Sequence, residues 1–496
     1  MTKKEALIYE QSHLGRSGTY LPQTASRRRL QDLIPSHLLR REQPQLPAVP
    51  ENEVVRHFVR LSVLNYGVDT GMYPLGSCTM KYNPKIAEYA ARKREFVHTH
   101  PYQDADTIQG LLAVMYELGE DLKSISGMDA VSLQPAAGAH GELTGILICR
   151  AYHTAQGNPR SKILVPDSAH GTNPATASMC GYRVVSIPST ARGTVDTHQL
   201  SQQIDGDTAA LMITNPNTLG IFEDEIEVIS DMVHASGGLM YYDGANMNAI
   251  MGYTKPDCMG FDLVHFNLHK TFGTPHGTGG PGAGPLAVRA QLAPFLPYPT
   301  IGLKERIYTL DCGSRDTSIG KVRSFFGNFL VLLKAYLYIR AHGSDGLKKV
   351  SQHAVLNANY LRKRVAGHLD MPYAADTLHE FVLSAVNLKK RQGVGALDIA
   401  KSLLDYGFHP PTVYFPLIVK EAVMIEPTDT ETRETLDAFA ASLAEIVKKA
   451  ETNPAELRTA PNSTLTSRPD EIRANRHPVL RARSLDARVT DNADTY

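Results

Sequence analysis

The sequence predicts an α/β fold in two parts: a large domain on a mostly parallel β-sheet covered by helices on both faces, and a smaller α+β domain towards the C-terminus. Three observations lead to this prediction. Short β-rich runs alternate with helical stretches through the first two thirds of the chain. Most of these runs are apolar in consecutive positions, as strands buried on both faces should be. A length of 496 residues also exceeds what one ordinary core supports.

The large domain is expected to cover residues 66–320. Its β-rich runs are the expected strands of the sheet, at residues 162–166, 182–188, 209–214, 238–243 and 263–267. Helical stretches such as residues 225–236 lie between the runs and would complete βαβ units. In open sheets of this kind, ligands bind beyond the carboxyl ends of the strands. We therefore expect the functional site at that edge of the sheet.

The rest of the chain is expected to form an N-terminal arm, a small domain and a tail. Residues 1–65 contain an arginine triplet and a proline-rich stretch, which favour an extended arm with a solvated helix face over a nucleic-acid patch. The small α+β domain is expected at residues 321–453, with helices at 325–341, 346–369 and 396–406, a strand near 380–388 and an apolar stretch at 424–427. From residue 454 onward, proline, arginine and asparagine interrupt the periodicity, so residues 454–496 are expected to be an extended tail.

Composition excludes several classes of protein. The chain has 51 basic residues (Lys and Arg) and 51 acidic ones, so its formal net charge of zero gives no general attraction to nucleic acid or to an anionic membrane. No apolar run is long enough for a signal peptide or a membrane span. The five cysteines are scattered without a Cys-x-x-Cys motif, which supports neither a disulfide framework nor a metal site. The sequence therefore predicts a cytoplasmic protein.

Two expected strand ends carry the residues that indicate the chemistry. The run at 238–243 ends in Asp243, and the run at 263–267 leads to His269 and Lys270, which a glycine-rich stretch follows. Pyridoxal phosphate (PLP) chemistry needs a lysine for a Schiff base and a carboxylate that keeps the pyridine nitrogen protonated. Each residue alone would more often be a turn or surface residue. Together, with His269 beside the lysine, two apolar strands leading in and a phosphate-friendly loop upstream, they predict a PLP site. The glycines fit neither a P-loop nor a Rossmann motif.

Polar and small residues upstream fit the same site. Ala137, Gly138 and Ala139 open a helical stretch, where backbone N–H groups can bind a phosphate. His140 follows this turn and could lie flat on the pyridine ring. Thr172 and Asn215 belong to polar segments, 167–174 and 214–218, that follow two expected strands. The alternative for each segment is ordinary turn chemistry.

Several motifs resemble a known family. They are Gly-Met-Tyr-Pro-Leu-Gly-Ser-Cys-Thr-Met-Lys-Tyr-Asn-Pro at 71–84, Asp-Ser-Ala-His-Gly-Thr-Asn-Pro-Ala at 167–175, Asp-Gly-Ala-Asn at 243–246, Asn-Leu-His-Lys-Thr-Phe at 267–272 and Pro-His-Gly-x-Gly-Gly-Pro-Gly at 275–282. They look like the glycine dehydrogenase (decarboxylating) family, the P-protein of the glycine cleavage system. The resemblance extends from about residue 20 to Arg483, and the length is similar to that of subunit 2 of the two-subunit bacterial form.

This resemblance implies the type I PLP-dependent transferase fold and a glycine dehydrogenase (aminomethyl-transferring). Such an enzyme decarboxylates glycine, releases CO2 and transfers the aminomethyl group to the lipoyl cofactor of H-protein. The site residues implied are Lys270 for the Schiff base, Asp243 at the ring nitrogen, His140 stacked on the ring, Ala137, Gly138 and Ala139 at the phosphate, and, from the logic of the fold, His269 near the phosphate or carboxylate and Asn246 near the ring hydroxyl. Cys78 is expected near the mouth of the site, where a buried, inert thiol is favoured over a redox-sensitive one.

The resemblance also implies partners and leaves alternatives open. A related subunit 1, in an α2β2 assembly, and lipoylated H-protein are the expected partners, and the glycine-rich loop at 273–284 is a candidate lid. One alternative is another type I PLP enzyme, such as an aminotransferase or a lyase. A requirement for lipoylated H-protein would distinguish the two. A second alternative, a non-catalytic scaffold half, is disfavoured because Lys270 and Asp243 are both present.

Overall fold

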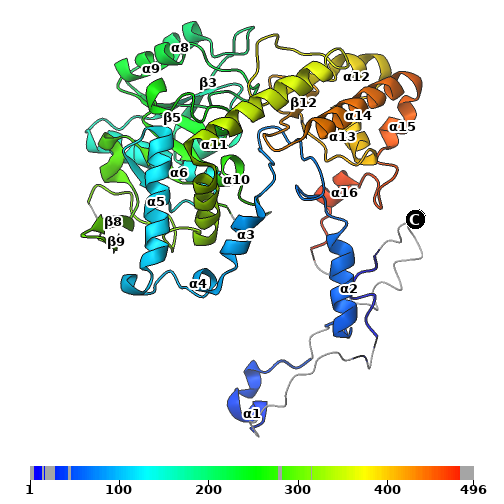
Figure 1. The fold of residues 1–496 in the computed structure, drawn as a ribbon, viewed down its shortest axis with the longest axis horizontal. Coiled ribbons are helices and arrows are strands. Elements are labelled where there is room, and N and C mark those ends of the chain that lie inside the picture. Colours follow the sequence, from blue (N-terminus) through cyan, green and yellow to red (C-terminus); the bar gives the residue numbers. More distant parts are fainter. Residues whose placement is uncertain are drawn as a thin grey trace. The chain divides into compact units, whose positions relative to one another are not determined.

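The computed structural model describes residues 5–13, 16, 28–42, 46–277, 282–313 and 316–480. Two compact units make up the chain: residues 68–462, and a second unit of residues 1–67 with residues 463–496. The three β-sheets of the described residues and the candidate site belong to residues 68–462 (Figure 1). Among the described helices, none has the length and apolar character needed to cross a membrane.

The centre of the 68–462 unit is a seven-stranded sheet with the order β1-β7-β6-β5-β4-β2-β3. Its strands are β1 (Ala130–Ser132), β2 (Lys162–Pro166), β3 (Arg183–Ile187), β4 (Thr208–Ile213), β5 (Leu239–Gly244), β6 (Leu263–Phe266) and β7 (Leu286–Val288). All neighbouring pairs from β3 to β6 are parallel, and β7 runs antiparallel to both β1 and β6. The predicted α/β fold with a mostly parallel sheet is confirmed.

Both faces of this sheet are buried, as the apolar runs predicted. Tyr241 and Tyr242 are neighbours on β5, yet they belong to different apolar clusters because successive side chains point to opposite faces. One face packs against α5 (Gln109–Ser126), α8 (Thr197–Gln203) and α9 (Ile226–Ala235). The other face packs against α6 (Gly138–Ala155) and α7 (Thr172–Met179). All five runs expected to be strands are strands, at β2 to β6.

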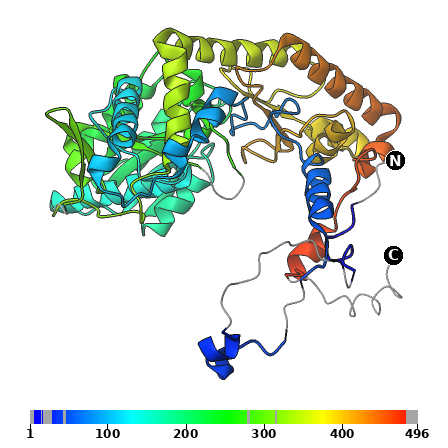
Figure 2. The same cartoon turned by 60° about the horizontal axis from the view of Figure 1, so that its bottom comes forward.

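One long helix joins the apolar core of the large sheet to that of the small sheet. α11 (Phe329–Arg364) bends at Gly343, where φ is 60° and ψ is −175° (Figure 2). Its first arm packs in the large-sheet core through residues such as Leu332, and its second arm packs in the small-sheet core through residues such as Leu361. The two helical stretches expected at 325–341 and 346–369 are therefore the arms of one bent helix.

The small sheet is antiparallel, with the order β10-β12-β11. Its elements are β10 (Phe381–Ser384), β11 (Thr412–Val413) and β12 (Ala422–Ile425), with α12 (Val386–Gln392), α13 (Ala396–Asp405) and α14 (Arg433–Thr452). In the register, Phe381 pairs with Ile425. The strand expected at 380–388 is correct only as far as Ser384, whose hydroxyl accepts a hydrogen bond from the N–H of Val386 as the chain turns into α12.

The ends of the chain contain more helix than expected. Residues 1–65, expected to be an extended arm, contain α1 (Leu30–Leu33) and the 12-residue helix α2 (Glu51–Ser62). The expected extended tail contains α15 (Pro454–Thr459) and α16 (Glu471–Arg476). Pro454 occupies the first turn of α15, where proline favours a helix instead of breaking it. Arg27 of the arginine triplet, part of the proline-rich stretch and residues 481–496 lie outside the described residues.

Shorter elements complete the fold. They are α3 (Lys85–Ala91), α4 (Arg94–Val97), α10 (Leu268–Thr271), the hairpin of β8 (Thr300–Lys304) and β9 (Ile307–Asp311), and the 3-10 helices η1 (Ser36–Leu38), η2 (Ala105–Thr107), η3 (Met247–Ala249), η4 (Asp257–Met259) and η5 (Ala290–Phe295). The glycine-rich loop expected to act as a lid includes residues 278–281, which lie outside the described residues.

Candidate active site

A cavity of about 470 Å³ lies at the carboxyl ends of the parallel strands, where the sheet topology places ligands. Elements far apart in the sequence line it. The lining residues come from the 76–78 turn, the start of α6, the segment after β2, the end of β5, α10 and the loop around β11, and they include Cys78, Gly138, His170, Asp243, Lys270 and Phe415.

Lys270 reaches this cavity because of how the chain leaves β6. β6 ends at Phe266, and the four-residue helix α10 begins directly after Asn267. Leu268 and Phe272 are fully buried, which fixes this short helix against the core. Lys270 itself is half-buried and lines the cavity. A primary amine therefore stands at a strand end, as the sequence predicted.

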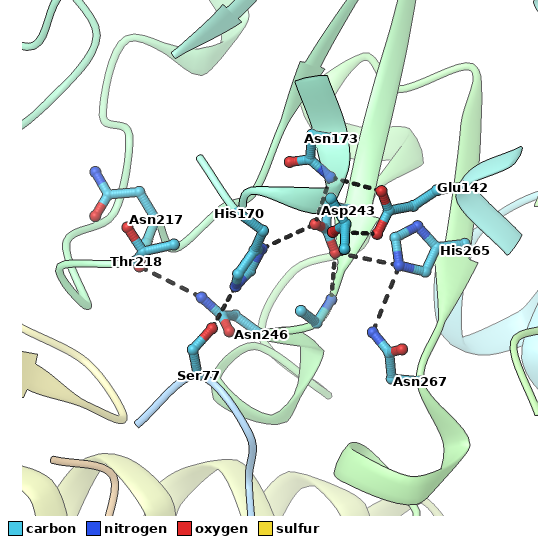
Figure 3. Close-up of polar contacts among 12 residues, drawn as sticks. Ser77, Glu142, His170, Asn173, Asn217, Thr218, Asp243, Asn246, His265 and Asn267 are labelled. Atoms are coloured by element: carbon cyan, nitrogen blue, oxygen red, sulfur yellow. Dashed lines mark hydrogen bonds and ion pairs between the residues drawn. The ribbon is translucent and has the colours of Figure 1, made fainter. Parts of the chain in front are cut away.

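Asp243 lies at the end of β5 with its carboxylate fully paired (Figure 3). Its Oδ2 accepts hydrogen bonds from His170 Nδ1 at 2.9 Å and Asn173 Nδ2 at 3.0 Å. Its Oδ1 accepts one from the N–H of Ala245 at 3.0 Å and lies 3.2 Å from Nε2 of His265. Burial alone would raise the pKa of Asp243, but His170 and His265 hold that pKa well below its usual range. The carboxylate therefore stays ionised.

A second carboxyl group, that of Glu142, lies beside Asp243 in a different electrostatic state. Glu142 accepts hydrogen bonds from Thr172 Oγ1 at 2.9 Å and Asn173 Nδ2 at 3.1 Å. Burial, together with the charge of Asp243, raises the pKa of Glu142. Burial lowers the pKa of His265, yet Asp243 outweighs it and the net shift is upward. The site thus keeps one carboxylate charged and favours a proton on its neighbour.

Sequence reasoning did not select Glu142 or His265. Each had a signal: Glu142 stands in the first turns of a mostly apolar helix, and His265 interrupts the apolar strand Leu263–Phe266. An ionisable residue within a buried element needs a partner, and here the two share Asp243.

The N-terminus of α6 offers an anion site. Among the described residues, no side chain caps this 18-residue helix, so the N–H groups of its first turn remain for a ligand. Gly138 stands at the first position, and a Cβ there would come within 1.8 Å of Oδ1 of Asn267. Only glycine allows this close approach between the α6 start and the chain leading to Lys270.

Seven of the predicted site residues line the cavity: Lys270, Asp243, Ala137, Gly138, Ala139, His269 and Thr172. The ring of His269 packs edge-on against that of His276, with centroids 4.9 Å apart. Burial and the neighbouring His276 lower the pKa of His269 to about 3, so the ring is neutral. Its Nδ1 is buried and has no hydrogen-bond partner among the described residues, which leaves it for a ligand.

The prediction for His140 does not fit the geometry. Its Nδ1 accepts a hydrogen bond from the N–H of Ala136 at 3.1 Å, so the ring folds back on its own turn, and His140 is not among the residues that line the cavity. His170 lines the cavity instead. Its ring is nearly parallel to that of Phe415, at an angle of 12° and a centroid distance of 6.0 Å, and lies between Ser77 and Asp243 (Figure 3).

Asn246 and Asn215 also lie outside the cavity lining, because the fold uses their side chains. Nδ2 of Asn246 donates to the backbone oxygen of Pro216 at 2.9 Å. Oδ1 of Asn215 accepts from the N–H of Glu223 at 2.9 Å. Both residues are fully buried, so their amides fix the loop after β4. The turn chemistry that the sequence left open for residues 214–218 accounts for Asn215.

Residues 25–405 match the family model of the glycine cleavage system P-protein, and residues 350–470 match that of the glycine dehydrogenase C-terminal domain. The chain belongs to the glycine cleavage system P-protein family. The family resemblance seen in the sequence motifs is confirmed.

Relatives and solved structures agree with this membership. The chain is 56% identical to the probable glycine dehydrogenase (decarboxylating) subunit 2 of Desulforamulus reducens, over 96% of this chain and 99% of that protein. Its fold resembles that of an inhibitor-bound glycine decarboxylase (P-protein), with a TM-score of 0.71 and 20% identity over 84% of this chain and 95% of the other. It also resembles the glutamate decarboxylase of Lactobacillus brevis, with a TM-score of 0.64 and 13% identity over 83% and 96% of the two chains. The predicted type I fold of PLP-dependent enzymes is confirmed.

PLP, the cofactor of this family and fold, fits the residues of the cavity. Asp243 provides the ionised carboxylate that a protonated ring nitrogen requires. The α6 start provides uncapped N–H groups for a phosphate, and Lys270 provides the amine. The unpaired Nδ1 of His269 is a further polar group at the same cavity.

Proposed function

We propose that this chain is the PLP-binding subunit of a two-subunit glycine dehydrogenase (decarboxylating) of the glycine cleavage system. It would release CO2 from glycine and pass the aminomethyl group to the lipoyl group of H-protein. The observation that carries the proposal is that Lys270 and the ionised Asp243 line one cavity together with the uncapped start of α6. The proposal is also supported by the relative from Desulforamulus reducens, which is named a probable glycine dehydrogenase (decarboxylating) subunit 2 and is 56% identical over 99% of its length.

Each residue has a role in this proposal. Lys270 attaches the cofactor, Asp243 holds a proton on the ring nitrogen, and the N–H groups of Gly138 and Ala139 bind the phosphate. His170 takes the ring-facing role that the sequence assigned to His140, because its imidazole lines the cavity. When bound, PLP supplies a conjugated cation that accepts the electron pair left by the departing carboxylate of glycine.

The two neighbouring carboxyl groups suit this division of roles. A charged Asp243 favours the proton on the ring nitrogen, whereas a second negative charge beside it would repel the first. Glu142 avoids repulsion because its raised pKa favours the protonated form, which still accepts from Thr172 and Asn173. We propose that Glu142 holds Asn173 and Thr172 in place around Asp243.

The reaction with H-protein is the test that separates this proposal from other PLP chemistry. Exchange of labelled bicarbonate into glycine should require the chain, its partner subunit and lipoylated H-protein. H-protein that carries an unmodified lysine in place of lipoyl-lysine is the matched control and should support no comparable exchange. Product formation from glycine at full rate without any H-protein would instead indicate an aminotransferase or a lyase.

The assembly and the location are part of the proposal. We propose an α2β2 complex with a related subunit 1, as the name of the relative suggests, in the cytoplasm. All five cysteines are free thiols, which suits a reducing compartment. Size exclusion with light scattering, with and without co-expressed subunit 1, tests the assembly. A well-behaved monomer that carries out the exchange at full rate without subunit 1 would contradict the two-subunit form.

A further inference from the structure

A short turn at residues 77–79 forms part of the cavity wall, and its backbone conformation is unusual. Ser77 has a φ of 64° and Thr79 a φ of 41°. Non-glycine residues rarely adopt this left-handed region, and two within three residues need other contacts to hold them there. Cys78, between them, lines the cavity.

Two buried carboxyl groups hold this turn from the small sheet. Oε2 of Glu380 accepts a hydrogen bond from the N–H of Ser77 at 2.7 Å. Glu426 accepts two from Thr79: one from its N–H at 3.0 Å and one from Oγ1 at 2.5 Å. Both glutamates have 0% of their surface exposed. Within this turn, the two residues with left-handed backbones are thus the two whose N–H groups donate to the carboxyls.

The small sheet places these two glutamates side by side. Phe381 on β10 pairs with Ile425 on β12, and Glu380 directly precedes Phe381 while Glu426 directly follows Ile425. The antiparallel register therefore puts residues 380 and 426 next to each other at one end of the sheet. The 75–76 segment lies along the same strand, because Leu75 forms a bridge with Ile425.

The electrostatic state of the pair suits this close placement. Burial raises the pKa of both carboxyls, that of Glu426 to about 7, and Glu426 raises the pKa of Glu380 further. Lys270, Lys81, the thiol of Cys78 and the neutral, fully buried His379 are ionisable groups near them, and both carboxyls raise the pKa of Cys78. A proton on one of the two carboxyls removes most of the repulsion between them.

The 77–79 turn also determines the position of His170. Ser77 Oγ is hydrogen-bonded to Nε2 of His170, and Nδ1 of the same ring is hydrogen-bonded to Asp243 (Figure 3). A ring fixed at both nitrogens has one orientation. The contacts therefore run without a break from Glu380 through Ser77 and His170 to Asp243.

We propose that Glu380 and Glu426 are positioning residues of the active site: they hold the 77–79 turn so that Ser77 fixes the His170 ring beside Asp243. The role of His170 rests on the proposed function. The contacts by which Glu380 and Glu426 hold the 77–79 turn do not depend on it. A cation bound by Glu380, Glu426 and His379 is disfavoured, because every carboxyl oxygen of the pair already accepts a hydrogen bond and Lys270 lies close by.

The thiol of Cys78 reports on the turn. Its alkylation rate by iodoacetamide, measured by peptide mass spectrometry on the full chain as purified, should rise at least about tenfold in Glu380→Ala and in Glu426→Ala, because the turn loses the contacts that keep it closed. The fully buried Cys149 in α6 reports on global unfolding and should stay unreactive. Glu223→Ala is the matched control: it removes a buried carboxyl that accepts from the backbone N–H of Val195 and makes no hydrogen bond to the turn among the described residues.

Milder variants separate the reach of the side chain from its charge. Glu426→Gln keeps the length and one acceptor, so Cys78 should react within about twofold of the wild-type rate, whereas Glu426→Asp shortens the reach and should raise the rate about threefold or more. These two variants replace the alanine variants if the latter fail to fold. An unchanged Cys78 rate in both alanine variants, or in Glu426→Asp, would overturn the proposal. Equal rises at Cys78 and Cys149 in Glu426→Asp would also overturn it.

A second measurement addresses the site itself. The glycine–bicarbonate exchange should show a kcat about 10-fold to 100-fold lower in Glu380→Ala, with a KM within about threefold of wild type, because misplacing His170 affects the reacting geometry more than glycine binding. A more reactive Cys78 with wild-type exchange would overturn the link to His170. If the wild type lacks exchange, the proposed function fails, and the alkylation result still decides whether the glutamates hold the turn. The metal content of both proteins is measured as well. If the wild type contains one equivalent of metal and Glu380→Ala contains none, the proposal is overturned in favour of a cation site.

Discussion

The ammonium group of Lys81 lies 2.8 Å from the carboxylate of Asp429, and the two side chains are 0% and 7% exposed. Lys81 gives its hydrogen bonds to Oδ1 of Asn248, the backbone oxygen of Thr271 and the hydroxyl of Tyr338, at 2.7, 3.0 and 3.3 Å, and meets Asp429 as an ion pair. Burial would lower the pKa of Lys81, but Asp429 outweighs it, so the lysine stays charged. Because Thr271 directly follows Lys270, this buried charge fixes the backbone next to the reactive amine.

We expect Lys81→Met to lower the free energy of unfolding by about 3–5 kcal/mol, because it leaves the carboxylate of Asp429 buried without its partner. The double variant Lys81→Met with Asp429→Leu should recover most of that loss, since neither charge then remains in the core. Urea denaturation of the wild type, both single variants and the double variant gives the coupling energy. Additive losses would show that the pair does not act as a unit.

Lys270→Ala should abolish covalent attachment of the cofactor and reduce the glycine–bicarbonate exchange to background, because the α10 amine is the group placed at the cavity. Borohydride reduction of the wild type followed by peptide mapping should label Lys270. The buried Lys81 provides an internal control and should stay unlabelled. A label on any other lysine contradicts the assignment.

Asp243→Asn should keep the cofactor bound but reduce the exchange by at least about two orders of magnitude, comparable with the loss of a strong electrostatic donor. The amide cannot carry the negative charge that His170 and His265 now stabilise, so the ring nitrogen loses the group that favours its proton. The kcat of the exchange and the absorbance of the bound cofactor are measured together. Exchange near the wild-type rate would mean that another group holds that proton.

The two histidines can be compared directly. His170→Ala should weaken cofactor binding at least about tenfold, because a ring on the cavity wall is lost, whereas His140→Ala should change it less than about twofold. The dissociation constant of PLP, measured by fluorescence titration, is the readout. The opposite order of the two variants would restore the assignment of His140 that the sequence suggested.

Glu223 gives a pH-dependent stability whose sign follows from its burial. Burial raises the pKa of Glu223 from 4.5 to about 7, so between these values the folded chain binds a proton that the unfolded chain does not. Stability from this group is therefore lost as the pH rises through that window. Relative to the wild type, Glu223→Gln should gain up to roughly 3 kcal/mol of unfolding free energy between about pH 4.5 and about pH 7. Glu227→Gln, an exposed change on α9, is the control in urea titrations at each pH, and a constant difference between Glu223→Gln and wild type would contradict the expectation.

The sheet and the central pair of site residues were predictable because both depend on local patterns. Apolar runs mark strands buried on both faces. Asp243 ends one of these runs, and Lys270 lies in the short helix that follows another. The choice between His140 and His170 could not be made from local patterns. The ring of His140 is hydrogen-bonded to the backbone of its own turn, whereas that of His170 is hydrogen-bonded to Ser77, 93 residues away in the chain. Glu380 and Glu426 carried only a weak signal, an acid at the edge of an apolar strand, whose meaning appears when β10 and β12 pair.

The hold of Glu426 on the 77–79 turn also bears on the order in which the protein acquires its site during synthesis. Ser77 leaves the ribosome before Lys270, and Lys270 leaves it before Glu426. A nascent chain that already contains the large sheet and the lysine still lacks the carboxyl that closes the wall beside His170. Both carboxyls can therefore hold the 77–79 turn only after residue 426 has been made, and truncation before residue 426 should leave a folded sheet with an incompletely walled site.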